Sequence, residues 1–383
     1  MKWSYRIARV SGIDIRVHLT FALIVGYFAL LFSREHGGLG ALFGAFLVCC
    51  LFFCVVLHEL GHSLVAQAFG VGVREIVLLP VGGVARLTRE PQHPWQELLI
   101  ALAGPLVNVA IGALLFVVAL LTFGSPWFLE GDIWQGLGRP SWSGLLSNLL
   151  ISNLVLAVFN MIPALPMDGG RVLRAGLAMI LGRARATNIA AALAQMLAAG
   201  LIALALFKLK DPVLMIIGVF VFLGAAQERA SSQASVLLRD LRAGDVVNPS
   251  HVVLGPGEPL GRLVGLILRT PQSHFPVVHG EQLIGVLGRE VALRALPKLG
   301  PDAYVAGLIE RQVTEVDASA TLDEVRRSIL EHDGRPVVVR GAQGYVGLLS
   351  FEDITRIVRV AARLEKSNAL RRAESRRSDA PLI

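Results

Sequence analysis

Two histidines and a glutamate within five residues are the strongest chemical signal in this 383-residue sequence. They form the run His58-Glu59-Leu60-Gly61-His62. In a helix, His58 and His62 lie about one turn apart on the same face, so both imidazoles can bind one metal ion. The ion that suits this pair is Zn²⁺, and Glu59 lies one position round the helix, where it can accept a proton from water. The spacing predicts a catalytic zinc site.

The surroundings of this run are apolar from Ala41 to Phe69. Ionisable side chains are energetically costly within a helix apolar enough to cross a membrane, so we take their presence there as a sign of function. A chance match would require three polar groups to be buried in lipid without a purpose. We therefore prefer the metal site to an accidental triplet on a helix surface.

The composition indicates a membrane domain followed by a soluble one. Hydrophobic residues make up 54% of the chain and the mean hydropathy is +0.61, above the range of soluble globular proteins. The apolar stretches fill residues 17–227 and fade afterwards. The net charge of +7 is not interleaved with aromatic residues, so we expect no nucleic-acid partner. The three cysteines share one apolar stretch and predict packing rather than disulfides.

Six apolar segments are candidates for membrane-spanning helices. They cover about residues 17–33, 40–69, 96–123, 143–162, 188–207 and 212–227. The first segment has the charge and apolar pattern of a signal peptide, but no small-x-small cleavage site follows it. We therefore expect an uncleaved membrane-spanning segment. With the N-terminus inside, the inner segments carry eleven Lys and Arg residues and the outer segments four. The positive-inside rule then predicts a multi-pass plasma-membrane protein with both termini in the cytoplasm.

Residues 76–87 predict two short apolar strands around a Pro/Gly turn. Lipid does not tolerate open strand edges, so we expect a re-entrant hairpin packed against protein. A strand edge beside the metal site could hold an extended peptide. Gly82 and Gly83, at the turn, are therefore candidate substrate-positioning residues.

A third metal ligand is expected where the fourth apolar segment ends. Prolines at 163 and 166 stop the helix there, and Asp168 follows, next to Gly169 and Gly170. Irregular backbone at membrane depth is expected only where it lines a cavity. Asp168 is either a helix cap or the carboxylate that the site still lacks, and we favour the ligand.

The third apolar segment contains Gly104-Pro105-Leu106-Val107-Asn108. Glycine and proline in a membrane helix permit close packing and a kink. Asn108 is polar at membrane depth and needs a partner. Its amide could join two helices or serve the site, including substrate positioning, and the sequence leaves both open.

An internal repeat of about 60 residues follows a polar, basic segment at 228–243, which we read as a linker. Phe275-Pro276-Val277-Val278 recurs as Arg335-Pro336-Val337-Val338. Each copy predicts an amphipathic helix, two short strands and a closing helix, at about 244–298 and 303–363. The tail at 364–383 is rich in Arg, Ser and Glu and is expected to be disordered.

The motifs in residues 1–227 resemble the site-2 protease family of intramembrane zinc metalloproteases. The resemblance is carried by His58 through His62, by Asn160 through Pro163, and by Pro166 through Gly169. It implies His58, His62 and Asp168 as zinc ligands and Glu59 as catalytic base. It also implies that Asn160 positions or polarises the substrate carbonyl.

The repeat at 244–363 resembles a tandem pair of CBS domains. That resemblance implies an adenine nucleotide bound through a Ser/Thr-x-x-Asp motif, which the second copy keeps as Ser350 and Asp353. The first copy has Gly288 and Val291 at these positions, so at most one such site is expected. A purely structural role, including homodimer formation, is the alternative. The expected fold is thus a polytopic α-helical membrane domain with a re-entrant β-hairpin, followed by an α/β CBS pair.

The function expected from these features is hydrolysis of peptide bonds in a membrane-embedded protein substrate, regulated through the CBS pair. One rival is a CBS-regulated metal or ion transporter, which would not require Glu59 as a proton acceptor. A second rival is an inactive membrane scaffold. The presence of every expected ligand argues against it.

Overall fold

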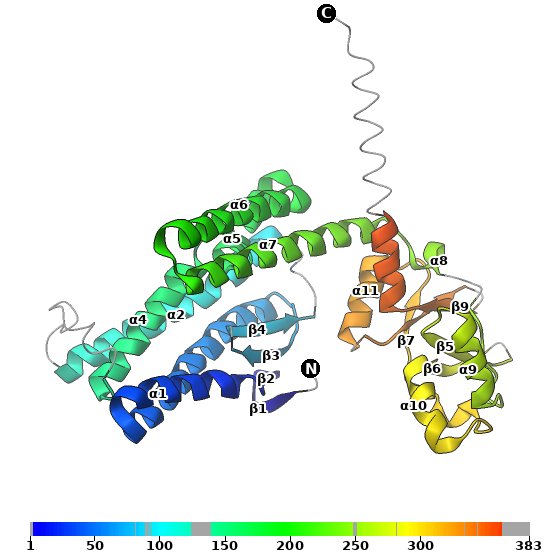
Figure 1. The fold of residues 1–383 in the computed structure, drawn as a ribbon. Helices are drawn as coiled ribbons and strands as arrows, with labels where there is room; N and C mark the ends of the chain where they lie inside the picture. Colours follow the sequence, from blue (N-terminus) through cyan, green and yellow to red (C-terminus); the bar gives the residue numbers. More distant parts are fainter. Residues whose placement is uncertain are drawn as a thin grey trace, which may run out of the picture. The chain divides into compact units, whose positions relative to one another are not determined.

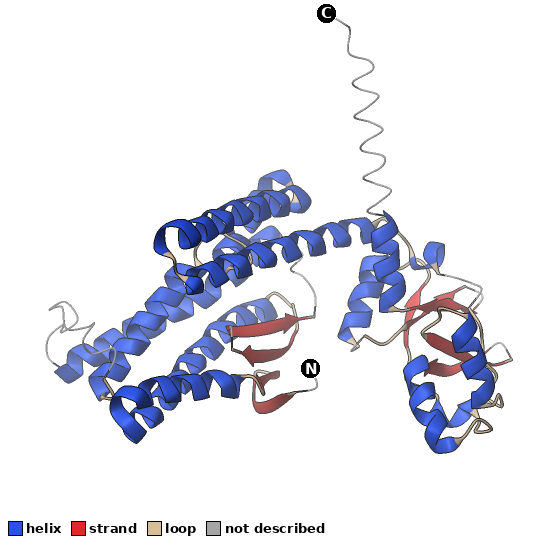
Figure 2. Ribbon diagram, in the orientation of Figure 1, coloured by secondary structure: helices blue, strands red, loops and turns tan. Residues whose placement is uncertain are grey.

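The computed structural model describes residues 3–80, 82–88, 91, 93–123, 139–247, 251–280, 282–332, 334–342 and 344–361. The chain divides into two compact units, Met1–Ser232 and Gln233–Ile383 (Figure 1). The first unit combines long helices with a four-stranded sheet, and the second contains two smaller sheets (Figure 2).

The sheet of the first unit contains the expected hairpin and two further strands. Its strands are β1 (Ser4–Val10), β2 (Ile13–His18), β3 (Val73–Leu79) and β4 (Gly82–Leu87), in the spatial order β1-β2-β3-β4. Strands β3 and β4 pair antiparallel, as expected, but β3 also pairs with β2 in parallel. The hairpin is therefore half of a larger sheet, and within the described residues β4 is the edge strand on its side.

The β1–β2 ribbon was missed, and the expected start of the first apolar helix was wrong. Val17 and His18 belong to β2, and the helix begins at Phe21. The ribbon turns at Ser11 and Gly12, both with positive φ (49° and 81°). The apolar alternation at positions 13, 15 and 17 was visible, but the adjoining apolar helix hid its two-residue period.

Helix α1 (Phe21–Ala68) contains two of the six expected segments. Forty-eight residues would form a straight helix about 72 Å long. However, the rings of Phe21 and Phe52 are 4.7 Å apart, and those of Phe32 and Phe43 are 5.4 Å apart. The chain therefore folds back at Gly37, whose φ of 59° and ψ of −145° are not helical. Figure 1 shows the two arms in dark and lighter blue.

Five further helices of this unit lie within the described residues, and the first two of them contact α1. They are α2 (Pro94–Phe123), α4 (Trp142–Asn160), α5 (Asp168–Leu181), α6 (Arg183–Leu204) with the π-helical turn η1 (Ala205–Leu209), and α7 (Pro212–Arg239). Among the described residues, five helices are long and apolar enough to cross a membrane: α1, α2, α4, α6 with η1, and α7. Helix α7 continues to Arg239, so most of the segment expected as a linker is helical.

The second unit consists of two similar halves, as the repeat predicted. The first half contains α8 (Ala243–Val246), α9 (Leu260–Arg269), β5 (His274–His279), β6 (Gln282–Gly288), α10 (Arg289–Leu299) and η2 (Val305–Leu308). The second contains β7 (Thr314–Asp317), α11 (Leu322–Glu331), β8 (Val337–Gly341), β9 (Gly344–Leu349) and a helix over residues 351–361. Each half has an apolar core, and α8 packs in the core of the second half. The expected disordered tail at 364–383 lies outside the described residues.

Candidate metal centre

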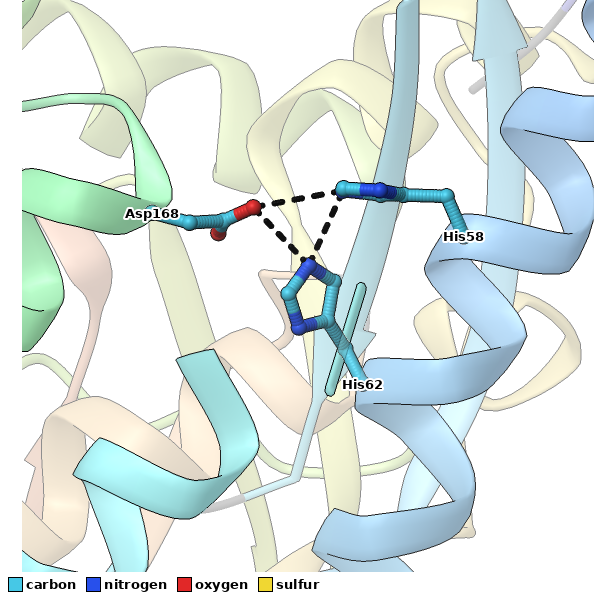
Figure 3. Close-up of side chains that lie close together, drawn as sticks. All are labelled: His58, His62 and Asp168. Carbon is cyan, nitrogen blue, oxygen red and sulfur yellow. Dashed lines mark hydrogen bonds and ion pairs between the residues drawn. The ribbon is translucent and has the colours of Figure 1, made fainter. Parts of the chain in front are cut away.

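Three buried side chains from two distant parts of the chain converge on one point (Figure 3). His58 Nε2 and His62 Nε2 are 3.0 Å apart, and Asp168 Oδ2 lies 3.2 Å from the first and 3.1 Å from the second. Ligands about 2.0 Å from a tetrahedral zinc ion are about 3.3 Å from one another. The two nitrogens and the oxygen are therefore spaced as three corners of a zinc coordination shell, and the donor set fits zinc.

The two histidines are held in the orientation that zinc binding requires. His58 Nδ1 lies 2.9 Å from Asn108 Oδ1, and His62 Nδ1 lies 2.6 Å from the Ile100 carbonyl oxygen. Both partners accept hydrogen bonds in this arrangement, so each ring donates from Nδ1 and keeps the Nε2 lone pair for a metal. Asn108 thus joins α1 to α2 and contacts a candidate ligand at the same time. Its expected contact with substrate stays a prediction.

Helix α2 reaches the histidine rings because it has no side chain at Gly104. A Cβ added there would lie 2.2 Å from His62 Nε2 and 2.7 Å from His58 Cε1. Such distances are far inside van der Waals contact, so only glycine allows α2 to pack directly on both rings. The sequence showed Gly104 as a packing residue, but not that the imidazoles are what it packs against.

Asp168 enters the cluster from the first turn of α5. The N-cap of this helix is Met167, so the alternative reading of Asp168 as the cap does not hold. A Cβ added at Gly169 would lie 2.3 Å from the carbonyl oxygen of Met161 and 2.4 Å from that of Ile162. The glycines after Asp168 therefore let α5 pack against the end of α4, and this contact fixes where the carboxylate lies.

Glu59 lies beside the edge strand of the sheet. A Cβ at Gly83 would lie 2.6 Å from Glu59 Cγ, so β4 runs directly past the glutamate. Gly82, the first residue of β4, has a φ of 134° and open space around its Cα. Asn160 is half-buried at the C-terminal end of α4, next to the carbonyl that Gly169 packs against. The roles expected of these residues stay predictions.

An ion-pair group around the buried Glu97, which the sequence analysis missed, connects three helices around the centre. Arg174 on α5 pairs with Glu97 on α2 and with Glu228 on α7. Its Nε donates a hydrogen bond to Glu97 Oε1 at 2.8 Å. The ion pair thereby joins α5, which carries Asp168, to α2, which contacts both histidine rings. Nothing in the sequence paired these three residues, which are separated by more than 50 positions.

In the second unit, Ser350 and Asp353 line a cavity of about 330 Å³. The lining includes His274 and Gln272 from the first repeat and Arg356 from the second. Asp353 Oδ2 accepts hydrogen bonds from the Ser350 amide and hydroxyl at 3.0 and 2.6 Å. Ser350 and Asp353 therefore cap the helix that follows, and this structural role explains the motif without a bound nucleotide. Burial lowers the pKa of His274 below its ordinary value, which keeps the imidazole of His274 neutral at pH 7.

The sequence matches Peptidase family M50 over residues 46–204 and the CBS domain over residues 243–298 and 305–360. A zinc metalloprotease of Methanocaldococcus jannaschii is 33% identical over 360 residues, covering 94% of this chain and 97% of the relative. The protein Rip3 of Mycobacterium tuberculosis is 28% identical over 386 residues, covering 94% of each chain. A solved site-2 protease from M. jannaschii is 38% identical, with a TM-score of 0.44, and the match covers 59% of this chain and 95% of that chain.

The resemblance read from the two motifs is confirmed by the family match and by the two relatives, each of which aligns over 94% of this chain. The family and the long apolar helices indicate a membrane metalloprotease, and the second unit is a pair of CBS domains. With its two-histidine, one-carboxylate centre, the chain belongs to Peptidase family M50, the site-2 protease family of zinc metalloproteases.

Proposed function

We propose that this chain is an intramembrane zinc endopeptidase that cleaves membrane-tethered proteins in or near their transmembrane segments. The observation that carries the proposal is the convergence of His58, His62 and Asp168, with Glu59 one position from His58. A purely structural cluster would have no use for both a correctly spaced ligand set and a neighbouring carboxylate.

The chemistry assigns a separate task to each side chain. A zinc ion held by His58, His62 and Asp168 would lower the pKa of a coordinated water molecule towards about 7 and polarise the scissile carbonyl. Glu59 accepts the proton of the attacking water and delivers it to the leaving amine. Asn160 donates a hydrogen bond from its amide to the oxyanion that develops on the substrate. Asn108 holds the His58 ring so that Nε2 faces the cluster.

The substrate is held as an extended strand along β4. A transmembrane helix hides its carbonyl groups in its own hydrogen bonds, so it must unwind before cleavage. The outer edge of β4 offers main-chain donors and acceptors that replace those bonds. Because Gly83 lies against Glu59, a strand paired near Gly83 would pass close to the base.

The membrane topology consistent with this function has six crossings, two of them from the arms of α1. Both termini and the CBS pair then lie in the cytoplasm, where the basic residues of the inner segments gather. The metal centre lies towards the cytosolic side, from which water reaches it.

The CBS pair regulates cleavage by binding an adenine nucleotide in the cavity that contains Ser350 and Asp353. The support for this role is the cavity between the two repeats and its combination of hydroxyl, carboxylate, imidazole and guanidinium groups. Binding would require Asp353 to exchange its contacts with Ser350 for contacts with a ribose. Homodimer formation through the same unit belongs to this proposal.

Substitution Glu59→Gln tests the proteolytic function. The purified full-length variant should keep its zinc, because the three ligands are unchanged, and should lose cleavage of a single-span membrane substrate. His58→Ala serves as the control that loses zinc and cleavage together. If the Glu59→Gln protein cleaves as fast as the wild type, the proposed mechanism is wrong. If it instead moves metal ions across proteoliposomes at the wild-type rate while neither protein cleaves, a transporter is the better description.

A further inference from the structure

The apolar face of the four-stranded sheet extends beyond the helix that covers it. Strand pairing places Tyr5 beside Val17 and Val10 beside Ile13 on one face. Ile13 is fully buried in the core formed by the sheet and α1, whereas Tyr5 is 65% and Val10 40% exposed. Trp3, two residues before Tyr5, is 61% exposed. The outer strand β1 thus carries a row of large apolar side chains that are 40 to 65% exposed.

The opposite face of the same ribbon is basic. Pairing places Arg6 beside Arg16 and Arg9 beside Asp14. Arg6 and Arg9 are both exposed, and each lies 3.6 Å from Asp14. One carboxylate thus faces two arginines there, which leaves the outer strand with excess positive charge. Apolar residues on one face and cations on the other are typical of a ribbon that lies at a membrane surface.

The connection to α1 restricts where this ribbon can lie. Strand β2 ends at His18 and α1 begins at Phe21. The first turns of α1 expose apolar side chains, among them Leu23 and Tyr27, as a helix surrounded by lipid would. Two intervening residues span at most about 10 Å, and the polar region of each leaflet is about 5–7 Å thick. The ribbon therefore cannot move away from the interface that α1 enters.

We propose that the β1–β2 ribbon, residues 3–18, is a lipid-binding element lying flat on the membrane. Trp3, Tyr5 and Val10 face the boundary between headgroups and acyl chains, where aromatic residues are enriched. Arg6 and Arg9 extend to the phosphates of anionic lipids. A second copy paired along β1 fits less well, because an antiparallel pair would place exposed arginines opposite one another.

The consequence for the metal centre follows from the continuity of the sheet. Strands β1 to β4 are joined edge to edge by hydrogen bonds, and β4 passes Glu59 at Gly83. A ribbon anchored in the lipid interface would hold β4 at a fixed depth. This inference depends on α1 crossing the membrane and not on proteolysis, so it can fail while the proposed function stands.

The test compares neighbouring positions on the two faces of β1. The full-length protein with its three cysteines replaced by alanine receives a nitroxide label at Tyr5→Cys or, as the matched control, at Arg6→Cys. Both variants are placed in nanodiscs containing anionic phosphatidylglycerol. The ratio of collisions with oxygen, which partitions into lipid, to collisions with a water-soluble nickel chelate should be at least about tenfold higher at position 5. Equal ratios would overturn the proposal, and so would a label at position 5 that neither reagent reaches, since protein would then cover this face.

A second measurement does not depend on the labelled variants. The full-length protein with Trp3 as its only tryptophan should lose at least about half of its fluorescence in nanodiscs whose acyl chains are brominated near the carbonyl. Fluorescence that instead responds only to iodide in the buffer would place Trp3 in water and overturn the proposal.

Discussion

Replacing Gly104 by alanine should remove zinc from the centre without changing any ligand. The new Cβ would lie 2.2 Å from His62 Nε2 and 2.7 Å from His58 Cε1, where ordinary contacts are 3.4 Å or longer. The His62 ring must therefore retreat by about 1 Å, which is several times the tolerance of about 0.2 Å in metal–ligand distances. Changes to residues that only support ligands lower metal affinity about 10- to 100-fold. We expect a loss of at least about 100-fold, or about 2.8 kcal/mol.

The assay is a competition between the purified full-length protein and a zinc chelator, followed by metal analysis of the protein. Gly112→Ala on the same helix is the matched control, because a Cβ there meets its nearest neighbour, Leu150 Cδ1, at an ordinary 3.9 Å. Both substitutions favour the helix by about 0.5–1 kcal/mol, so general loss of folding would not explain a difference. If the two variants hold zinc equally tightly, the packing of α2 on the imidazoles does not set the metal geometry and this reasoning fails.

Three further substitutions test other contacts of the structure. Gly83→Ala should displace Glu59 and reduce cleavage at least about tenfold with zinc content unchanged, because the three atoms nearest the new Cβ all belong to the glutamate. Loss of zinc would contradict this. Arg174→Met should lower the free energy of unfolding in detergent by about 3 kcal/mol, because it leaves the buried Glu97 unpaired, whereas replacing the exposed Arg229 by Met should lower it by less than about 1 kcal/mol. Equal unfolding midpoints of the two variants would count against a structural role for the Arg174–Glu97 pair. Thr321→Ala should destabilise the CBS pair by about 1 kcal/mol in denaturant titration, since the threonine hydroxyl caps α11, and an unchanged midpoint would refute the capping role.

The chemical groups of the centre could be predicted from the sequence because their types and spacing carry the information. His58 and His62 are one helical turn apart, and Asp168 follows a proline-broken segment, so each was recognisable within its own stretch of chain. The CBS repeat was visible for the same reason, since a period of about 60 residues is a local comparison. The β3–β4 hairpin was also local, because Gly and Pro mark its turn.

Contacts between distant segments could not be predicted in this way. The parallel pairing of β2 with β3 joins residues about 60 positions apart, and no local pattern indicates a partner. The sequence predicted two segments where the structure has α1, and only the ring contacts at Phe21 and Phe32 show that the two arms of this helix pack antiparallel. Arg174 resembled one more basic residue of an inner segment until its two glutamates were located.

The least predictable part of the centre is the set of positions where a side chain is missing. Gly104 allows the histidine rings to pack against α2, Gly83 allows Glu59 to pack against β4, and Gly169 allows the end of α4 to pack against α5. These glycines carry no ligand or basic group, so in the sequence they have the signature of ordinary packing or turn residues. Yet at each of them two elements lie so close together that an added methyl group would not fit. A methyl group there would move a ligand, the base or the helix that carries Asp168. The geometry of the metal centre therefore depends on these absent side chains as directly as on the ligands. For that reason a substitution as small as a single methyl group is the sharpest probe of the centre.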